Sequence, residues 1–143
     1  MRILVAKWPT VTAQVNDNAR AVVWTSTAAE NLKAYNLERT RAGVLTRTVQ
    51  VAIQLGRAVA LNVTDPDGEW HLAVTPAGIV VEHTLGEPYV DVDDDLMPVK
   101  GPCRQCNTPC AITAASCSTC RVEAPTSAAE GLQLLNPSAW SHA

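Results

Sequence analysis

Apolar and polar residues alternate along two neighbouring stretches in the middle of the chain. Every second residue of the stretch 49–55 is Val, Ile or Leu, and the stretch 59–63 repeats the pattern. A period of two is typical of a β-strand that buries one face. The pattern therefore predicts strands at 48–55 and 59–63.

Two turn sequences extend this pattern into an antiparallel meander. Residues 65–68 (Asp-Pro-Asp-Gly) and 75–78 (Thr-Pro-Ala-Gly) each combine a proline, which presets φ, with a glycine that accepts a positive φ. Closing the first turn aligns apolar residues on one face, in the pairs Val63–Trp70, Leu61–Leu72 and Val59–Val74. Closing the second turn predicts the pairs Val74–Ile79, Leu72–Val81 and Trp70–His83.

A helix is the alternative for residues 44–59. On a helical wheel most of the Val, Leu and Ile residues lie on one side, and the other side carries long polar side chains: Arg47, Gln50, Gln54 and Arg57. The β-branched content of the stretch and Gly56 favour strands, because β-branched side chains lose rotamer freedom in a helix.

The first forty residues predict short strands and one helix. Strand patterns occur at 2–6, 10–15 and 20–25, and the sequence Asn-Asp-Asn at 16–18 predicts a turn. A capping box, Thr followed three residues later by Glu, begins at Thr27, and good helix formers follow it. We therefore expect a short helix at about 28–39.

A second capping box lies near the end of the chain. Ser127 is followed by Glu130 and by three leucines. These residues predict a short C-terminal helix that ends before Pro137, because the residue before a proline disfavours helical geometry.

These elements predict a mainly β (α+β) fold. We expect an antiparallel, sandwich-like β body over residues 1–86 with its one short helix at 28–39. An acidic, proline-containing linker at 87–100 leads to a small module at 101–122, and residues 123–143 form the short helix and tail. A chain of 143 residues has room for one such domain and a small appendage.

Charge is distributed unevenly along the chain, although the net charge is only −3. Residues 1–60 carry eight Lys or Arg against three acids, whereas residues 61–99 carry nine acids and no Lys or Arg. Such a split can steer a partner or favour head-to-tail packing. The simpler interpretation is a solvated acidic loop around residues 91–95, which lacks the Gly and distal Glu of a calcium loop.

The most specific chemical signal is a pair of Cys-x-x-Cys motifs, Cys103/Cys106 and Cys117/Cys120. Four thiolates brought together by two tight turns form a tetrahedral metal site, and a closed site of this kind usually holds a structural zinc ion. The twenty or so residues around them have too few large apolar side chains for a core of their own. We therefore expect the metal to stabilise this segment.

The segment 101–122 resembles a zinc ribbon, a small module with two knuckles and four cysteine ligands. This resemblance implies structural Zn²⁺, with iron in a rubredoxin-like site as the alternative. The segment departs from the common knuckle sequence, because Arg104 and Ser118 replace Pro while Asn107 and Arg121 replace Gly. Asn tolerates a positive φ better than Arg does, so knuckle geometry is expected more strongly at the first pair.

Cys110 is a fifth cysteine without an assigned role. It can replace one of the four ligands, sit as a small buried apolar residue, or remain a free thiol. We expect a residue that is not a ligand, because two complete pairs already fill four positions. A redox or metal sensor that uses this thiol is a third hypothesis for the function.

No motif in the sequence predicts catalysis or a small-molecule substrate. The chain has no phosphate-binding glycine loop and no nucleophile elbow. The meander would place His83 on its inner face and His71 on its outer face, where structural roles are expected. We therefore predict a protein that is not an enzyme.

Membrane insertion is not predicted either. No apolar run approaches the ~20 residues that a spanning helix needs, and the first apolar run is too short for a signal peptide. Metal-binding thiols also agree with a reducing compartment. We expect a cytoplasmic protein, or one assembled in the cytoplasm into a particle.

The favoured function is a zinc-stabilised protein–protein interaction or assembly protein. Its partner would be another protein or further copies of the chain, as in a larger particle such as a phage virion. The alternative is a zinc-ribbon regulator that contacts nucleic acid through Arg104, Arg121 and the arginines of 39–57. A sequence pI of about 5.5 and few aromatic residues give this alternative little support.

Overall fold

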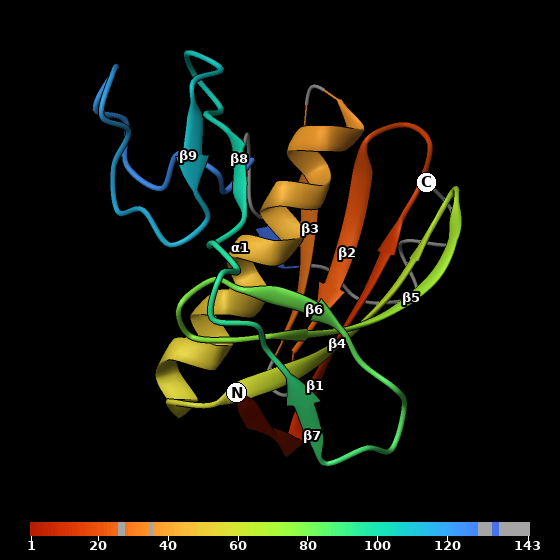
Figure 1. The fold of residues 1–143 in the computed structure, drawn as a ribbon. Coiled ribbons are helices and arrows are strands. Elements are labelled where there is room, and N and C mark those ends of the chain that lie inside the picture. The colour runs from red at the N-terminus through yellow and green to blue at the C-terminus, as the bar shows by residue number, and fades with distance from the viewer. Residues whose placement is uncertain (26–27, 35, 129–132, 135–143) are drawn as a thin grey trace.

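The computed structural model describes residues 1–25, 28–34, 36–128 and 133–134 of the chain, and its fold is mainly β, as predicted (Figure 1). No helix among these residues is long and apolar enough to cross a membrane. The elements in chain order are β1 (Arg2–Val15), β2 (Arg20–Trp24), β3 (Ala29–Lys33), α1 (Leu37–Leu55), β4 (Ala58–Asp65), β5 (Gly68–Val74), β6 (Val80–Glu82), β7 (Tyr89–Asp91), β8 (Lys100–Pro102), β9 (Pro109–Ala111) and β10 (Gln133–Leu134).

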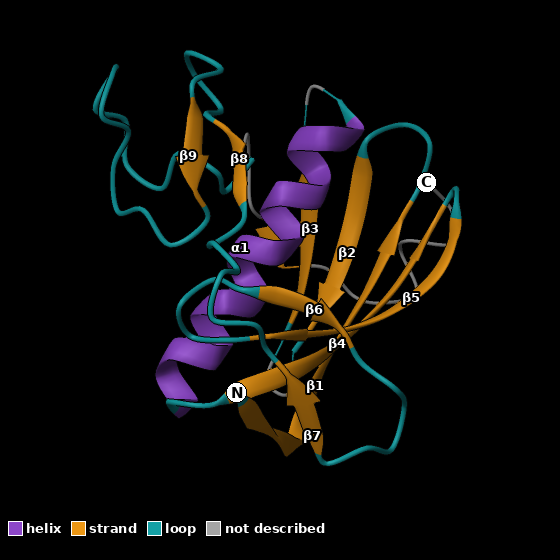
Figure 2. Ribbon diagram, viewed as in Figure 1, coloured by secondary structure: helices purple, strands orange, loops and turns teal. Residues whose placement is uncertain are grey.

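Most strands form one mixed sheet in the order β10-β3-β2-β1-β4-β5-β6, with β7 paired to the start of β1. The strands β8 and β9 form a separate hairpin. The pair β1–β4 is parallel and the other pairs are antiparallel. The parallel pair arises because α1 carries the chain back across the sheet between β3 and β4 (Figure 2).

The β4–β5 hairpin confirms the predicted register. Val63 lies opposite Trp70, Leu61 opposite Leu72, and Val59 opposite Val74. The Asp65 carboxylate accepts a hydrogen bond from the backbone N–H of Asp67 at 2.8 Å, which closes the turn. Local turn chemistry and alternation were therefore sufficient to align these strands.

The predicted β5–β6 register is wrong by one residue, because Val74 lies opposite Val80 and not Ile79. Thr75 and Ile79 close the loop, since the Thr75 N–H donates to the Ile79 carbonyl at 2.9 Å. This pair leaves three residues in the turn, with Gly78 at φ 83°. The shift places Val81 opposite Ala73, so β6 presents Val81 to the face away from α1.

The two histidines follow this corrected register. The backbone N–H of His83 donates to the carbonyl of His71 at 2.9 Å, so His83 is not paired with Trp70. The His71 ring nitrogen Nδ1 lies 2.8 Å from Asn62 Oδ1, and His83 Nε2 lies 2.7 Å from the Glu87 carbonyl.

Residues 44–55 form part of the helix α1, so the favoured strand interpretation of this stretch is wrong and its helical alternative is correct. Asn36 caps the helix by accepting a hydrogen bond from the Arg39 N–H at 2.9 Å, and Gly56 ends it at φ 67°. Buried threonine hydroxyls bond to carbonyls one turn back, as Thr46 does to Ala42 at 2.8 Å. Caps and burial against the sheet override the weak β preference.

The helix predicted at 28–39 is also wrong, because residues 29–33 form the strand β3 and α1 begins only at Leu37. This strand pairs with β2 along its whole length and buries Leu32, which is 1% exposed. The predicted C-terminal helix lies partly outside the described residues. Its residues 133–134 are a strand that pairs with β3.

The N-terminal strand predictions are confirmed with one difference. The predicted strands at 2–6 and 10–15 are a single long strand, β1, whose pairing with β4 shifts register between Ala6 and Thr10. The expected turn after β1 forms, and Asn16 Oδ1 accepts from the Arg20 N–H at 3.2 Å.

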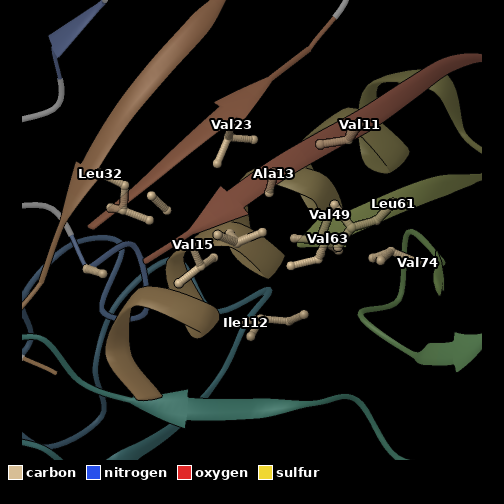
Figure 3. Packing of buried hydrophobic residues seen from close by; sticks show 13 residues of the cluster. Val11, Ala13, Val15, Val23, Leu32, Val49, Leu61, Val63, Val74 and Ile112 are labelled. Atoms are coloured by element: carbon tan, nitrogen blue, oxygen red, sulfur yellow. The ribbon is translucent and has the colours of Figure 1, made fainter. Parts of the chain in front are cut away.

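The largest core lies between α1 and one face of the sheet, and residues far along the chain complete it (Figure 3). Val11 and Val23 from the sheet and Val49 from α1 are fully buried there. Ile112, which follows β9, is 1% exposed and belongs to the same cluster, as does Ala128. The cysteine-bearing segment thus contributes side chains to the core of the body.

Part of the predicted acidic linker is integrated into the sheet. In strand β7, Val90 lies opposite Ile3, and the Val92 N–H donates to the Met1 carbonyl at 2.7 Å. Val90 and Val92 are buried on the sheet face away from α1. Further along, the Val99 N–H donates to the Gly78 carbonyl at 2.9 Å, which attaches β8 to the body.

Candidate metal centre

The four predicted cysteine ligands converge on one point. The Sγ atoms of Cys103, Cys106, Cys117 and Cys120 all lie within 4.8 Å of one another. Cys103 Sγ is 3.6 Å from Cys120 Sγ, and Cys106 Sγ is 3.6 Å from Cys117 Sγ. The fold therefore brings into contact two pairs of cysteines that are separated in sequence by 17 and 11 positions.

The first Cys-x-x-Cys pair is held by three hydrogen bonds from backbone N–H groups. The Cys103 N–H donates to the Thr108 carbonyl at 2.9 Å, and the Asn107 N–H donates back to the Cys103 carbonyl at 3.0 Å. The Gln105 N–H points at Cys103 Sγ at 3.4 Å. This arrangement orients the sulfur.

The second pair repeats the same pattern residue for residue. The Cys117 N–H donates to the Val122 carbonyl and the Arg121 N–H donates to the Cys117 carbonyl, both at 3.0 Å. The Thr119 N–H points at Cys117 Sγ at 3.4 Å. Two equivalent turns therefore face each other across the cluster.

Both turns use a left-handed residue directly after their second cysteine. Asn107 has φ 65° and Arg121 has φ 64°. Knuckle geometry was expected more strongly at the first pair, but Arg121 takes the left-handed conformation as fully as Asn107. The backbone hydrogen bonds of the turn here outweigh the steric preference of a residue with a Cβ.

The geometry fits a tetrahedral metal ion. With metal–sulfur bonds of about 2.3 Å, ideal tetrahedral sulfur–sulfur separations are about 3.8 Å. The two contact pairs at 3.6 Å are close to this value, and no pair exceeds 4.8 Å. Four thiol ligands fill a tetrahedral shell without an open position, which is the donor set of a structural site.

Hydrogen bonds favour the thiolate at two of the four cysteines, Cys117 and Cys106, whereas the pKa of Cys120 is raised to about 12 by burial and the neighbouring thiols. N–H groups of Cys120 and Thr119 lower the pKa of Cys117 to about 6. Hydrogen bonding by Thr108 likewise lowers the pKa of Cys106. Metal binding requires deprotonated cysteines, so these two residues are the ones that the donors favour for a cation, and a bound cation would have to displace the proton of Cys120.

Cys110 is not one of the four cysteines whose sulfurs converge among the described residues. It lies on β9 opposite Gly101, is 7% exposed, and directs its Sγ to the Thr108 carbonyl at 3.3 Å. Burial, with neighbouring thiols, raises its pKa to about 11. A protonated, buried thiol next to the cluster is the state that this position favours.

The cluster is attached closely to α1, which lies between the sheet and the β8–β9 hairpin (Figure 1). A Cβ placed on Gly101 of β8 would lie 2.5 Å from the Cβ of Ala42. After the second knuckle, Thr126 Oγ1 lies 2.8 Å from Thr46 Oγ1 in the buried interface. Only a residue without a side chain permits β8 to approach α1 this closely.

The two arginines predicted as nucleic-acid contacts have different environments. Arg104 donates through Nη2 to the Glu123 carbonyl at 2.9 Å, and so links the first knuckle to the segment after the second. Arg121 is exposed. Arg39 of α1 donates to the Arg104 carbonyl at 3.4 Å and to Asn107 Oδ1 at 3.1 Å.

A buried arginine near this interface was not predicted from the sequence. Arg47 is 9% exposed, pairs through Nε with Glu30 Oε2 at 2.9 Å, and donates to the Gly43 and Ser127 carbonyls. Burial lowers the pKa of its guanidinium, and Glu30 opposes that shift. The helical wheel assigned Arg47 to the polar side, and no local pattern separates it from its exposed neighbours.

Comparison of the chain with protein-family models, with curated proteins and with solved structures found no match.

Proposed function

We propose that this protein acts by binding other proteins rather than by catalysis, and that a structural Zn²⁺ ion rigidifies the segment that completes its fold. The observation that carries the proposal is the closed four-thiol cluster attached to the core. Four sulfurs complete a tetrahedral shell, and Ile112 from the same segment is buried in the main core. A closed site of this kind holds the backbone around it in one conformation, and a rigid surface lowers the entropic cost of docking.

The two matching knuckles support the zinc-ribbon interpretation of residues 101–122. They share the same backbone hydrogen bonds and the same left-handed residue after the second cysteine. Zinc is preferred because it favours closed tetrahedral thiolate shells, and iron in a rubredoxin-like site is the competing metal. Assembly into a larger particle in the cytoplasm is the setting we propose for the docking role.

A regulator that binds nucleic acid is the second candidate, and one contact favours it. Arg39 and Arg104, which are 65 residues apart, meet at the junction of α1 and the first knuckle. The Arg39 guanidinium bonds to the Arg104 main chain there, and a guanidinium is a common phosphate contact. The net charge of −3 and the carbonyl partners of Arg104 argue against a strong electrostatic footprint.

Native mass spectrometry with and without a chelator tests the first proposal. We expect one zinc ion per chain, and assembled species heavier than the 15.3 kDa monomer that dissociate when zinc is removed. A site that fills with iron from a mixed-metal medium contradicts the zinc assignment. A chain that stays monomeric with its metal bound leaves docking to a different protein as the required mode.

Fluorescence anisotropy with a labelled 20-base-pair duplex and a single-stranded RNA separates the two candidates. Protein docking predicts no binding in the range of roughly 10⁻⁴–10⁻⁶ M that is typical of non-specific nucleic-acid binding. Binding that falls steeply as salt rises, and that an Arg39→Gln/Arg104→Gln variant loses, favours the regulator instead.

A further inference from the structure

An apolar groove lies between the first half of α1 and the β4–β5 hairpin. It has a volume of about 290 Å³ and opens to solvent. Its walls are aliphatic side chains of the sheet and the helix, namely Val15, Val44, Leu45, Leu61, Val63 and Leu72. A concave apolar site with a few convergent polar groups is the usual form of a binding pocket.

One buried carboxylate organises the rim of this groove. The Asp65 side chain is 6% exposed, and its Oδ2 pairs with Arg41 Nη2 of α1 at 3.1 Å. Its Oδ1 accepts from the indole Nε1–H of Trp70 on β5 at 3.3 Å. Asp65 therefore fixes both the arginine on the helix side and the tryptophan on the hairpin side. The groove is held in shape before anything enters it.

The rim is negatively charged. Arg41 Nη2 contacts both Asp65 and Asp67, so two carboxylates share one guanidinium. The Asp67 side chain is 69% exposed at the turn, and Glu69 beside it is also exposed. A cationic group that approaches the hairpin therefore meets unneutralised carboxylate charge.

Trp70 forms an exposed aromatic wall. It is 45% exposed although it is one of the groove's lining residues. Partly exposed tryptophans next to apolar pockets are frequent anchor points of protein interfaces, since they bury a large surface with little loss of side-chain entropy.

We infer that this groove docks a segment of a partner protein that inserts one aliphatic or aromatic side chain and carries a Lys or Arg within two positions of it. The inserted side chain would pack between Leu72 and Val44 and cover Trp70. The neighbouring cation would pair with Asp67. This inference rests on the proposed protein-docking function and names its surface and the chemistry of its partner.

Selection of phage-displayed random 12-residue peptides against the intact, zinc-loaded protein tests the inference. We expect enriched peptides to share an apolar residue with a Lys or Arg within two positions. Amide chemical-shift mapping of one enriched peptide should place it on 41–45 of α1 and on 63–72 of the hairpin.

Three variants sharpen the test. Trp70→Ala should weaken binding of the selected peptide about tenfold or more, since substitution of hot-spot aromatic residues has effects of this size. Asp67→Lys should weaken binding of the same peptide about fivefold. Trp8→Ala is the matched control, because Trp8 is 73% exposed and lies outside the groove. It should leave the affinity unchanged, and thermal melts confirm that each variant is folded.

Other outcomes overturn the inference in distinguishable ways. Peptides that are acidic or that map elsewhere refute this groove while the docking function stands. Self-association that Trp70→Ala abolishes identifies a second copy as the occupant and refutes the partner segment. Absence of any enriched peptide, together with a monomeric chain in native mass spectrometry, refutes both the inference and the function on which it rests.

Discussion

The cysteines of the cluster differ in role although they lie within eighteen residues of one another. Four of them bring their sulfurs within 4.8 Å of one another. The fifth, Cys110, lies on β9 and directs its thiol to the Thr108 carbonyl. The four converging cysteines are the first and last residues of the two Cys-x-x-Cys turns, whereas Cys110 lies outside both turns.

Substitution of single cysteines should separate these roles. Cys117→Ser removes a thiolate from the shell, so we expect loss of the bound metal and a large fall in the melting temperature. Cys110→Ser should keep one metal ion per chain. Elemental analysis after dialysis measures the stoichiometry, and a metal-free Cys110→Ser protein would instead make Cys110 a ligand.

The left-handed residue after the second knuckle is a second position where one side chain matters. Arg121 is exposed at φ 64°, and a glycine there avoids a left-handed strain of about 1–2 kcal/mol while it loses part of that gain as chain entropy. Arg121→Gly should therefore raise the unfolding free energy by about 0.5–1 kcal/mol in urea titrations. Asn107→Gly should raise the unfolding free energy by less, because Asn107 also accepts a hydrogen bond from Arg39, which glycine cannot accept through a side chain. Equal gains at both positions would contradict this explanation.

Among the elements, α1 connects the other parts of the molecule. Its residues contact the sheet through Val44 and Val49, the segment after the second knuckle through Thr46, and β3 through Arg47. Changes on this helix are therefore expected to affect both the body and the cysteine-bearing segment.

Loss of the buried arginine should be costly. Arg47→Met removes the pair with Glu30 and two hydrogen bonds to carbonyls, which we expect to lower the unfolding free energy by about 2–3 kcal/mol. This value is below the usual cost of breaking a fully buried pair because Glu30 is 34% exposed. The control is Gln50→Met on the same helix, which is exposed and should change stability by less than about 0.5 kcal/mol. Similar losses in the two variants would show that Arg47 has no special role.

The contact between β8 and α1 depends on a glycine. Gly101→Ala would place a methyl group 2.5 Å from the Ala42 Cβ, and we expect a loss of about 1–3 kcal/mol from overpacking. Ala42→Gly removes the opposing methyl at a cost of about 1 kcal/mol for a glycine inside a helix. The double variant should lose less unfolding free energy than the two single variants lose when their losses are added. Additive losses in thermal or urea unfolding would rule out this close approach.

At the scale of the whole molecule, the cysteine-bearing segment and the body share one core. Ile112 and Ala128, on either side of the second knuckle, lie in the same cluster as sheet residues such as Val11 and Val63. The metal is therefore expected to stabilise the entire fold and not only the residues near the cysteines.

Metal removal should destabilise the helix and the sheet together. A chelator is expected to lower the unfolding free energy by more than about 4 kcal/mol, the value for a ligand at a thousand times its Kd, and to leave a single transition in far-UV circular dichroism. Acidification from pH 7 to pH 5 should release the metal, because protons compete for the thiolates and the stabilisation they give is lost as pH falls. A body transition that does not move after the metal is gone would make the segment an independent unit.

Several features of this protein followed from local sequence alone. The β4–β5 hairpin and its register follow from the Asp-Pro-Asp-Gly turn and the period of two, because both signals act over fewer than a dozen residues. Each Cys-x-x-Cys turn follows from its own spacing, since it is closed by its own backbone hydrogen bonds. These features need no information from distant parts of the chain.

Other features were decided only by contacts between distant residues. Residues 44–55 are helical because caps at Asn36 and Gly56 and burial against the sheet outweigh a β preference of well under 1 kcal/mol per residue. The burial of Arg47, the meeting of Arg39 with Arg104 and the groove beside Trp70 each join segments many residues apart. Side-chain packing across such separations is a property of the assembled core, and no local pattern of residues encodes it.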